Sequence, residues 1–149
     1  MKEVGGETNI HPACMENFWP SGQPFQLHFS LTDIEDLAKK NVNARITVPG
    51  VQPKLSLRLN ENNENERMTI VGALQGNYIL KPPHKAYPQM PEMEALCMSL
   101  LQSAKIDTVP FALIPLKSGE LAYITKRIDR ENGYKLAMED FCQLTERLT

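Results

Sequence analysis

A lysine and a glutamate are spaced so that the lysine could bind a phosphate group while the glutamate holds the lysine in place. Lys81 ends the strand-like run NYILK, and Glu94 lies in the helix-like run PEMEALCMSLLQSA. At about 100° per residue, Glu94 falls about 80° from the centre of that helix's apolar stripe, whereas Glu92 points well away from it. A lysine that neutralises phosphates needs a carboxylate to hold it in place. We therefore predict that Lys81 and Glu94 face each other between the strand and the helix.

Both residues also have ordinary structural explanations. A lysine at a strand end is commonly solvated, because lysine is almost never fully buried unless it is paired. A carboxylate at the edge of a buried helix face is commonly either a boundary residue or one member of an ion pair. Residue types and spacing alone leave these alternatives open.

The segment TVPGVQPKLSL, residues 47–57, has a second pattern suited to phosphate. Gly50 lies in a short loop that opens a strand pair, and Lys54 follows just behind it. A loop that covers phosphates needs glycine, because its backbone must come close to the ligand. This loop has one Gly, however, and Pro49 and Pro53 each lack an N–H that could meet a phosphate. A purely structural turn is therefore the alternative.

Strands that could position these residues are indicated by apolar side chains at every second position. The pattern predicts strands at 45–48, 54–60, 68–74 and 77–81, with the polar run 61–66 as a solvated hairpin tip. A short helix is predicted before them at about 32–40, with Ser30 or Thr32 as its N-cap. The Pro-containing arm at 1–24 shows little periodicity and is expected to be held by large side chains such as Phe18 and Trp19.

The second half of the chain predicts a long helix, a hairpin and a short helix. Residues 91–104 begin with Pro91 and carry an apolar stripe of Met93, Leu96, Cys97, Leu100, Leu101 and Ala104. Strands at 111–116 and 121–126 flank a turn that contains Gly119. A final helix is predicted to start near Met138, with Phe141, Leu144 and Leu148 on one stripe. We expect the chain to stop short of a second lobe, so this stripe should be exposed or covered by another copy. The fold class predicted is α+β, with an antiparallel sheet of about five strands.

Composition narrows the classes of function. The 149 residues suit one domain, and 16 Lys and Arg against 18 Asp and Glu give a formal charge of -2. No global positive field would gather nucleic acid or an anionic membrane. Cys14, Cys97 and Cys142 are widely spaced and are expected to be cytosolic thiols, with Cys97 and Cys142 buried in apolar segments. With no apolar leader and no membrane span, we expect a cytoplasmic protein.

Six blocks in order and spacing closely resemble the HipA family of bacterial Ser/Thr kinases. They are TVPGVQPKLSL, YILKP, PEMEALCMSLL, VPFALIPL, LAYITKRIDR and MEDFCQL, and they run from about Ile46 to Leu148. The stretch from His11 to Lys40 resembles the front of the shorter, HipT-like members. The resemblance implies an amino-terminal arm and helix at 1–43, and a kinase-like small lobe at 44–149 that is truncated before the catalytic lobe. His11 and Cys14 alone cannot form a four-ligand zinc site, so no metal is expected.

The resemblance also implies roles for individual residues. Lys81 would be the nucleotide lysine and Glu94 its helix partner, and no catalytic residue is expected in this chain. Backbone groups of Lys126 and Ile128, in a hinge at 125–128, would meet the adenine edge. Thr47 matches the family's regulatory phosphorylation position. The loop over the phosphates would comprise Gly50, Val51, Gln52 and Lys54. Arg127, Asp129 and Arg130 are expected to form a local ion network after the hinge.

The function implied is ATP binding, with Mg²⁺, by the small lobe of a toxin–antitoxin kinase whose relatives slow translation and are linked to persistence. The chain by itself is expected to be catalytically inactive. The implied partners are a helix-turn-helix antitoxin, a small HipS-like protein and a protein substrate such as an aminoacyl-tRNA synthetase. The alternatives are a stand-alone regulatory module derived from a kinase small lobe, and an α+β interaction domain that binds no nucleotide.

Overall fold

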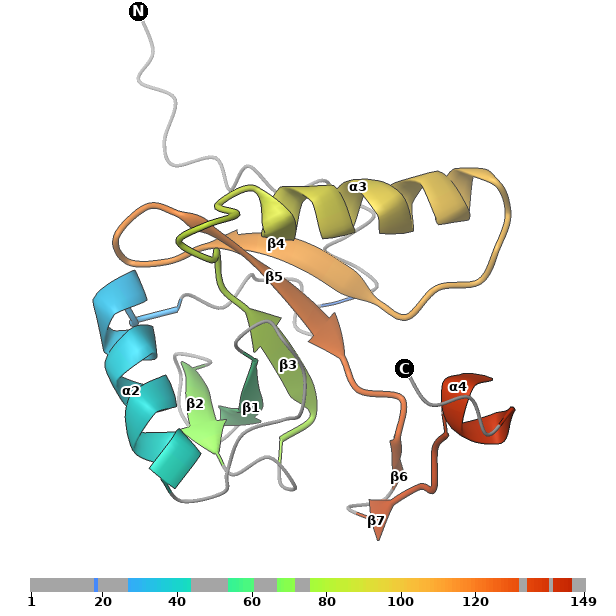
Figure 1. Ribbon diagram of the computed structural model, residues 1–149, viewed down its shortest axis with the longest axis horizontal. Coiled ribbons are helices and arrows are strands. Elements are labelled where there is room, and N and C mark those ends of the chain that lie inside the picture. The colour runs from blue at the N-terminus through green and yellow to red at the C-terminus, as the bar shows by residue number, and fades with distance from the viewer. Residues whose placement is uncertain are drawn as a thin grey trace, which may run out of the picture.

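The computed structural model describes residues 18, 27–43, 54–60, 67–71, 76–131, 134–139 and 141–145. Its centre is a five-stranded sheet in the order β2-β1-β3-β5-β4 (Figure 1). The strands are β1 (Leu55–Asn60), β2 (Arg67–Val71), β3 (Tyr78–Lys81), β4 (Phe111–Pro115) and β5 (Leu121–Lys126). With one long helix, α3 (Met90–Ser103), and a short C-terminal helix, α4 (Phe141–Leu144), the α+β fold predicted from the sequence is confirmed.

All neighbouring strands of this sheet are antiparallel. The two predicted hairpins are confirmed: β1 pairs with β2, and β4 pairs with β5. In the β4–β5 turn, Gly119 has a φ of +100°, a left-handed conformation that L side chains rarely adopt. A two-stranded ribbon of β6 (Arg130–Glu131) and β7 (Tyr134–Lys135) follows and was not predicted. The strand predicted at 45–48 lies outside the described residues.

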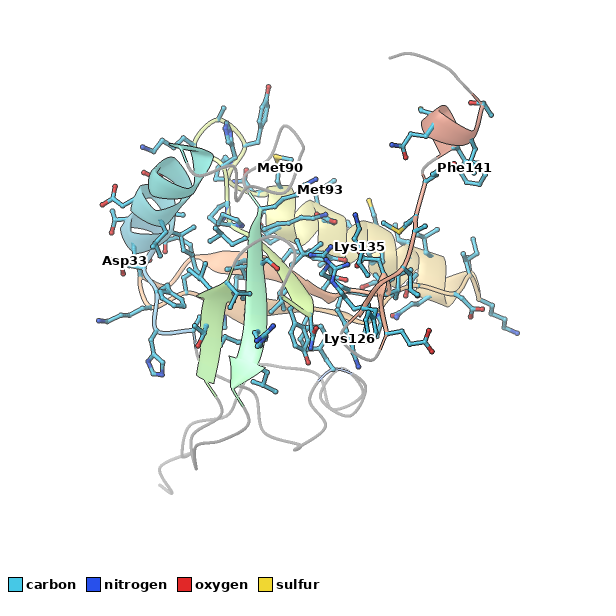
Figure 2. The ribbon with its side chains drawn as sticks, turned by 90° about the horizontal axis from the view of Figure 1, so that it is seen from below. Asp33, Met90, Met93, Lys126, Lys135 and Phe141 are labelled. Carbon is cyan, nitrogen blue, oxygen red and sulfur yellow. The ribbon has the colours of Figure 1, made fainter. Side chains whose placement is uncertain are left out.

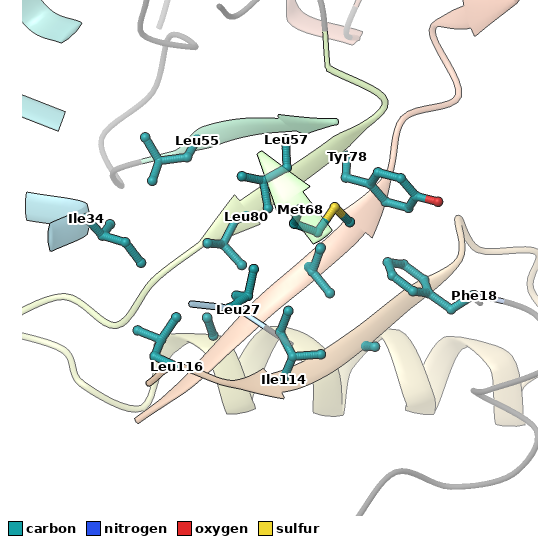
Figure 3. Packing of buried hydrophobic residues seen from close by; sticks show 13 residues of the cluster. Phe18, Leu27, Ile34, Leu55, Leu57, Met68, Tyr78, Leu80, Ile114 and Leu116 are labelled. Carbon is teal, nitrogen blue, oxygen red and sulfur yellow. The ribbon is translucent and has the colours of Figure 1, made fainter. Parts of the chain in front are cut away.

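Side chains of alternate residues divide the sheet into two faces. The first face carries the hydrophobic core, which Phe18, Leu27, Ile34 and Leu116 complete from outside the strands (Figure 3). Phe18 is 1% exposed and the centre of its ring lies 5.4 Å from that of Tyr78, so the expected anchoring of this side chain is confirmed. Trp19 and the rest of the arm lie outside the described residues. The strand residues of the core are Leu55, Leu57, Met68, Tyr78, Leu80, Ala112, Ile114, Ala122 and Ile124.

Helix α2 (Leu31–Asn43) begins where the sequence predicts a cap. The amide of Asp33 donates to the Ser30 hydroxyl at 3.2 Å, and the amide of Ser30 donates to the Asp33 carboxylate at 2.9 Å. This reciprocal pair satisfies two backbone donors that the first helical turn leaves free. Ser30 is therefore the N-cap. The helix contributes Ile34, which is 1% exposed, to the core.

Helix α3 lies across β4 and β5 on the second face of the sheet (Figure 1). The sequence predicts that α3 is buried along its apolar stripe, and this prediction is wrong. The helix packs on the sheet through Pro91 and Ala95, on the side opposite that stripe. These two small residues let the helix backbone approach the sheet closely, and half-buried Glu94 and Met98 share their side. The predicted stripe is exposed: Met93 by 56%, Leu96 by 51%, Leu100 by 60% and Leu101 by 38%, with Cys97 and Ala104 also exposed.

Helix α4, near the C-terminus, lies apart from the five-stranded sheet (Figure 2). Phe141 on α4 is 85% exposed and Leu144 is 60% exposed, which agrees with the expectation of an uncovered stripe; Leu148 lies outside the described residues. The expectation of buried cysteines is wrong for Cys97 and Cys142, which are free and exposed because both lie on the uncovered sides of their helices. No helix among the described residues is long and apolar enough to cross a membrane.

A close approach of two backbone segments at Gly76 yields a testable prediction. A Cβ atom at Gly76 would lie 2.0 Å from the Ser56 hydroxyl, 2.7 Å from the Leu57 carbonyl oxygen and 2.8 Å from the Leu57 nitrogen. Ser56 is 3% exposed and has little room to move. Gly76→Ala should therefore lower the free energy of unfolding by about 1–3 kcal/mol, measured by urea denaturation.

The matched control removes only the nearest atom. Ser56→Ala in the Gly76→Ala background should restore part of the lost stability, because the contacts with the Leu57 backbone remain. Ser56→Ala alone should have little effect, because the Ser56 hydroxyl is buried without a hydrogen-bond partner among the described residues. A Gly76→Ala variant as stable as wild type would contradict this packing.

Candidate functional site

The centre of the candidate site is the pair formed by Lys81 and Glu94. Lys81 is the last residue of β3, and Glu94 lies in the first turns of α3. The Lys81 side chain and helix α3 lie on the same face of the sheet. The Lys81 ammonium group donates a hydrogen bond to the Glu94 carboxylate. The two side chains are 20% and 29% exposed, so the pair is half-buried but reachable from solvent. The predicted contact between Lys81 and Glu94 is confirmed.

The reason for this contact differs from the one inferred from the helical stripe. Glu94 lies on the side of α3 that carries Pro91 and Ala95, and that side faces the sheet. It is therefore within the packed side of the helix, not at the rim of the exposed stripe. Glu92, which was expected to point away, is half-buried, and one of its carboxylate oxygens has no hydrogen-bond partner among the described residues.

Tyr123 also contacts the Lys81 side chain, and the sequence alone did not identify this residue as part of the site. In the β3–β5 register Lys81 is directly opposite Tyr123, and its ammonium nitrogen lies 5.3 Å from the centre of the Tyr123 ring. This distance allows a cation–π interaction. The ring is 1% exposed and stacks on Phe111 with a centroid distance of 5.8 Å. Lys81 is thus held between an aromatic face and a carboxylate.

The Tyr123 hydroxyl stays protonated over the whole physiological range. Burial raises the pKa of this phenol well above its ordinary value of 10, and the negative charge of Glu94 raises it further. A neutral ring next to Lys81 leaves Glu94 as the negative charge that pairs with the lysine. The register of β3 with β5 is the signal that would have identified Tyr123, and it was missing from the sequence patterns.

The backbone at the end of β5 offers one acceptor and one donor. Pro110 is opposite Lys126, and the Lys126 amide donates to the Pro110 carbonyl at 3.0 Å. Proline has no N–H, so it cannot return the hydrogen bond to the Lys126 carbonyl. The Thr125 hydroxyl, 3.4 Å from that carbonyl, lies closer to the Pro110 oxygen, at 3.0 Å. Two residues further on, the Ile128 amide has no acceptor among the described residues.

The Lys126 carbonyl accepts only the long hydrogen bond from Thr125, and the Ile128 amide has no acceptor among the described residues. A carbonyl and an amide at this spacing could bind the edge of a flat ring that carries both a donor and an acceptor. The side chains do not obstruct it, because Lys126 is exposed and Ile128 is 61% exposed. These are the two residues for which the resemblance to the HipA family implies such contacts. Their position at one end of β5 is observed, and their role remains a prediction.

Of the residues predicted to cover phosphates, the structure describes one. Lys54 comes directly before β1, and Lys81 directly follows Leu80, which pairs with Leu55. The two lysines therefore lie at the same end of the β1–β3 pair, where their charges would add. Thr47, Gly50, Val51 and Gln52 lie outside the described residues.

The ion network predicted after the hinge is confirmed, and it is buried. Arg127 donates to the Asp129 carboxylate through Nε at 2.8 Å and through Nη2 at 2.7 Å, and Arg130 donates through Nη1 at 2.6 Å. The side chains of Arg127, Asp129 and Arg130 are 8%, 7% and 7% exposed. The hydrogen bond from Arg127, together with the positive charges of both arginines, lowers the pKa of Asp129 from 3.8 to about 2. Asp129 is therefore committed to structure and is unsuited to act as a base near neutral pH.

Metal ligands do not gather in the described part of the chain. No group of three or more His, Cys, Asp or Glu side chains there could hold a metal ion. His11 and Cys14 lie outside the described residues, so the structure does not test them.

Comparisons with known proteins agree with the resemblance in sequence. A family model for the HipA-like C-terminal domain matches residues 46–149. A Haemophilus influenzae protein named "Putative kinase" is 31% identical over 94 residues, which cover 60% of this chain and 26% of that protein. The chain thus spans about a quarter of the length of the curated relative that it matches. The match over residues 46–149 shows that this chain belongs to the family of HipA-like C-terminal domains.

Proposed function

We propose that this chain is the ATP-binding small lobe of a HipA-like Ser/Thr protein kinase. The observation that carries the proposal is the contact of Lys81 with Glu94 between a sheet and a packed helix. In protein kinases a lysine on the third strand of the small lobe contacts the nucleotide phosphates, and a glutamate on the neighbouring helix holds it in place. Here Tyr123 adds a third contact that restrains the lysine.

The adenine edge would bind at the end of β5. The Lys126 carbonyl would accept from the exocyclic amine of adenine, and the Ile128 amide would donate to a ring nitrogen. What supports this role is that the opposite residue, Pro110, lacks the N–H that would otherwise pair with the Lys126 carbonyl. ATP would then extend from this edge toward Lys81 and Lys54, which together would neutralise its phosphates.

Residues 1–149 by themselves are proposed to bind ATP weakly and to transfer no phosphate. Phosphoryl transfer also needs Mg²⁺ held by an Asp and an Asn, and a further Asp that orients the attacking hydroxyl. Asp129 is occupied by two arginines. The antitoxin, the HipS-like protein and the protein substrate expected from the resemblance belong to this proposal as partners of the whole kinase.

One incubation tests both parts of this proposal. The purified chain is equilibrated with radiolabelled ATP and Mg²⁺, bound nucleotide is measured by equilibrium dialysis, and covalent label is measured after denaturation. We expect saturable binding at about millimolar ATP, which corresponds to roughly 4 kcal/mol, and no covalent label above background. Stoichiometric labelling of Thr47 that disappears in Lys81→Ala would overturn the inactivity, and an absence of saturable binding would overturn the nucleotide site.

A further inference from the structure

One edge of the buried guanidinium of Arg130 lacks a hydrogen-bond acceptor among the described residues. Its Nη1 donates to the Asp129 carboxylate at 2.6 Å and to the Asp129 carbonyl at 2.9 Å. Its Nε and Nη2 are buried without any hydrogen-bond partner among the described residues. Because the side chain is 7% exposed, water contacts these donors little. Buried donors are almost always paired, so this edge calls for an acceptor.

The geometry of the empty edge specifies the acceptor. Nε and Nη2 are the two atoms through which Arg127 grips both carboxylate oxygens of Asp129, at 2.8 Å and 2.7 Å. The contact of Arg127 with Asp129 therefore shows the two-point geometry that Nε and Nη2 of Arg130 could form with another carboxylate. Such a fork matches a group with two coplanar oxygens.

The local charge also favours an anion. Among the described residues, the counter-ion of Arg130 is Asp129, and Arg130 shares that carboxylate with Arg127. Lys135 is the partner of Arg130 in the β6–β7 register and adds a further positive charge nearby. Glu131, the adjacent acidic residue, is exposed and forms no ion pair among the described residues. A buried arginine is stabilised by a carboxylate that pairs its remaining donors, so a second carboxylate would suit Arg130.

We propose that the Nε–Nη2 edge of Arg130 is a carboxylate-binding site, separate from the proposed nucleotide site. The carboxylate has two sources. One is Glu139 of this chain, which is exposed and has no partner among the described residues. The Leu136 amide donates to the Asp129 carbonyl at 2.9 Å, and three residues span at most about 10 Å, so Glu139 can reach the cluster. The other source is a free carboxylate from solution.

The experiment follows the Nε–H signals of the arginines in ¹H–¹⁵N NMR spectra of the 149-residue chain. Arg127 provides an internal reference, because its Nε–H already donates to a carboxylate. Sodium acetate is titrated against sodium chloride at equal ionic strength, in wild type and in Glu139→Gln. The arginine Nε–H signals are assigned by triple-resonance spectra of the wild-type chain. The assignment therefore does not depend on a folded variant that lacks Arg130.

The two sources give different results, and both support the site. If Glu139 fills the edge, the Arg130 proton resonates downfield near that of Arg127, is insensitive to acetate, and moves upfield in Glu139→Gln. If a free carboxylate fills it, acetate shifts the Arg130 proton downfield and saturably in both proteins, while the Arg127 proton stays in place. An Arg130 signal that neither acetate nor Glu139→Gln moves would overturn the proposal.

Discussion

Replacing Asp129 by asparagine should lower the free energy of unfolding by about 3–5 kcal/mol, because it removes the carboxylate charge that two buried guanidinium groups share. Arg127 and Arg130 both donate to this carboxylate, and all three side chains are less than 10% exposed. Urea denaturation at pH 7 measures the loss. The control is Glu131→Gln, an exposed residue of the same segment, which should change stability by less than about 0.5 kcal/mol.

The same carboxylate should govern part of the acid sensitivity of the fold. Its pKa is about 2 in the folded chain and 3.8 ordinarily, so folding favours the ionised form. The stabilisation therefore amounts to about 2 kcal/mol above about pH 5, and it is lost as the pH falls from about 4 towards 2. Asp129→Asn should remove this part of the pH dependence. An Asp129→Asn variant with wild-type stability and an unchanged acid transition would show that the cluster is not formed.

Lys81→Ala should weaken MgATP binding by at least about tenfold, since hydrogen bonds to charged groups contribute about 1.5–3 kcal/mol. Glu94→Gln should weaken it less, because the lysine remains and only its orientation is lost. Isothermal titration calorimetry measures both affinities. The fold should tolerate the lysine change, because the Lys81 side chain is 20% exposed.

Lys85→Ala is the matched control for Lys81. Lys85 is four residues away, carries the same charge and pairs with Glu35 at 3.2 Å, with its side chain 81% exposed. This variant should bind MgATP as wild type does. Equal affinities for Lys81→Ala and wild type, with unchanged melting temperatures, would mean that the nucleotide phosphates do not contact Lys81.

The strands and hairpins could be predicted from the sequence because their signals are local. Alternation identifies β1, and Gly119 marks the β4–β5 turn, since both depend on neighbouring residues only. The capping box of α2 is equally local: Ser30 and Asp33 are three residues apart. Each of these elements therefore agrees with its prediction to within a few residues.

The orientation of α3 could not be predicted, because it depends on which side can approach the sheet. A stripe of large apolar residues normally marks the buried side of a helix. In this chain Pro91 and Ala95 permit the closer contact, and Leu96 and Leu100 remain exposed. Glu94 meets Lys81 because it lies on that closely packed side. The role of Tyr123 likewise depends on the register between β3 and β5, which the sequence does not encode locally.

The most direct test of the nucleotide site is a titration of the ¹⁵N-labelled chain with MgATP, followed through backbone amide shifts. We predict saturable changes at the Ile128 amide and around Lys81, with α2 unaffected because its described residues lie toward the other face of the sheet. The Ile128 amide should move downfield, as expected for a donor that gains an acceptor. An Ile128 signal that stays in place at saturating MgATP, or shifts confined to α2, would contradict the proposed ATP-binding small lobe.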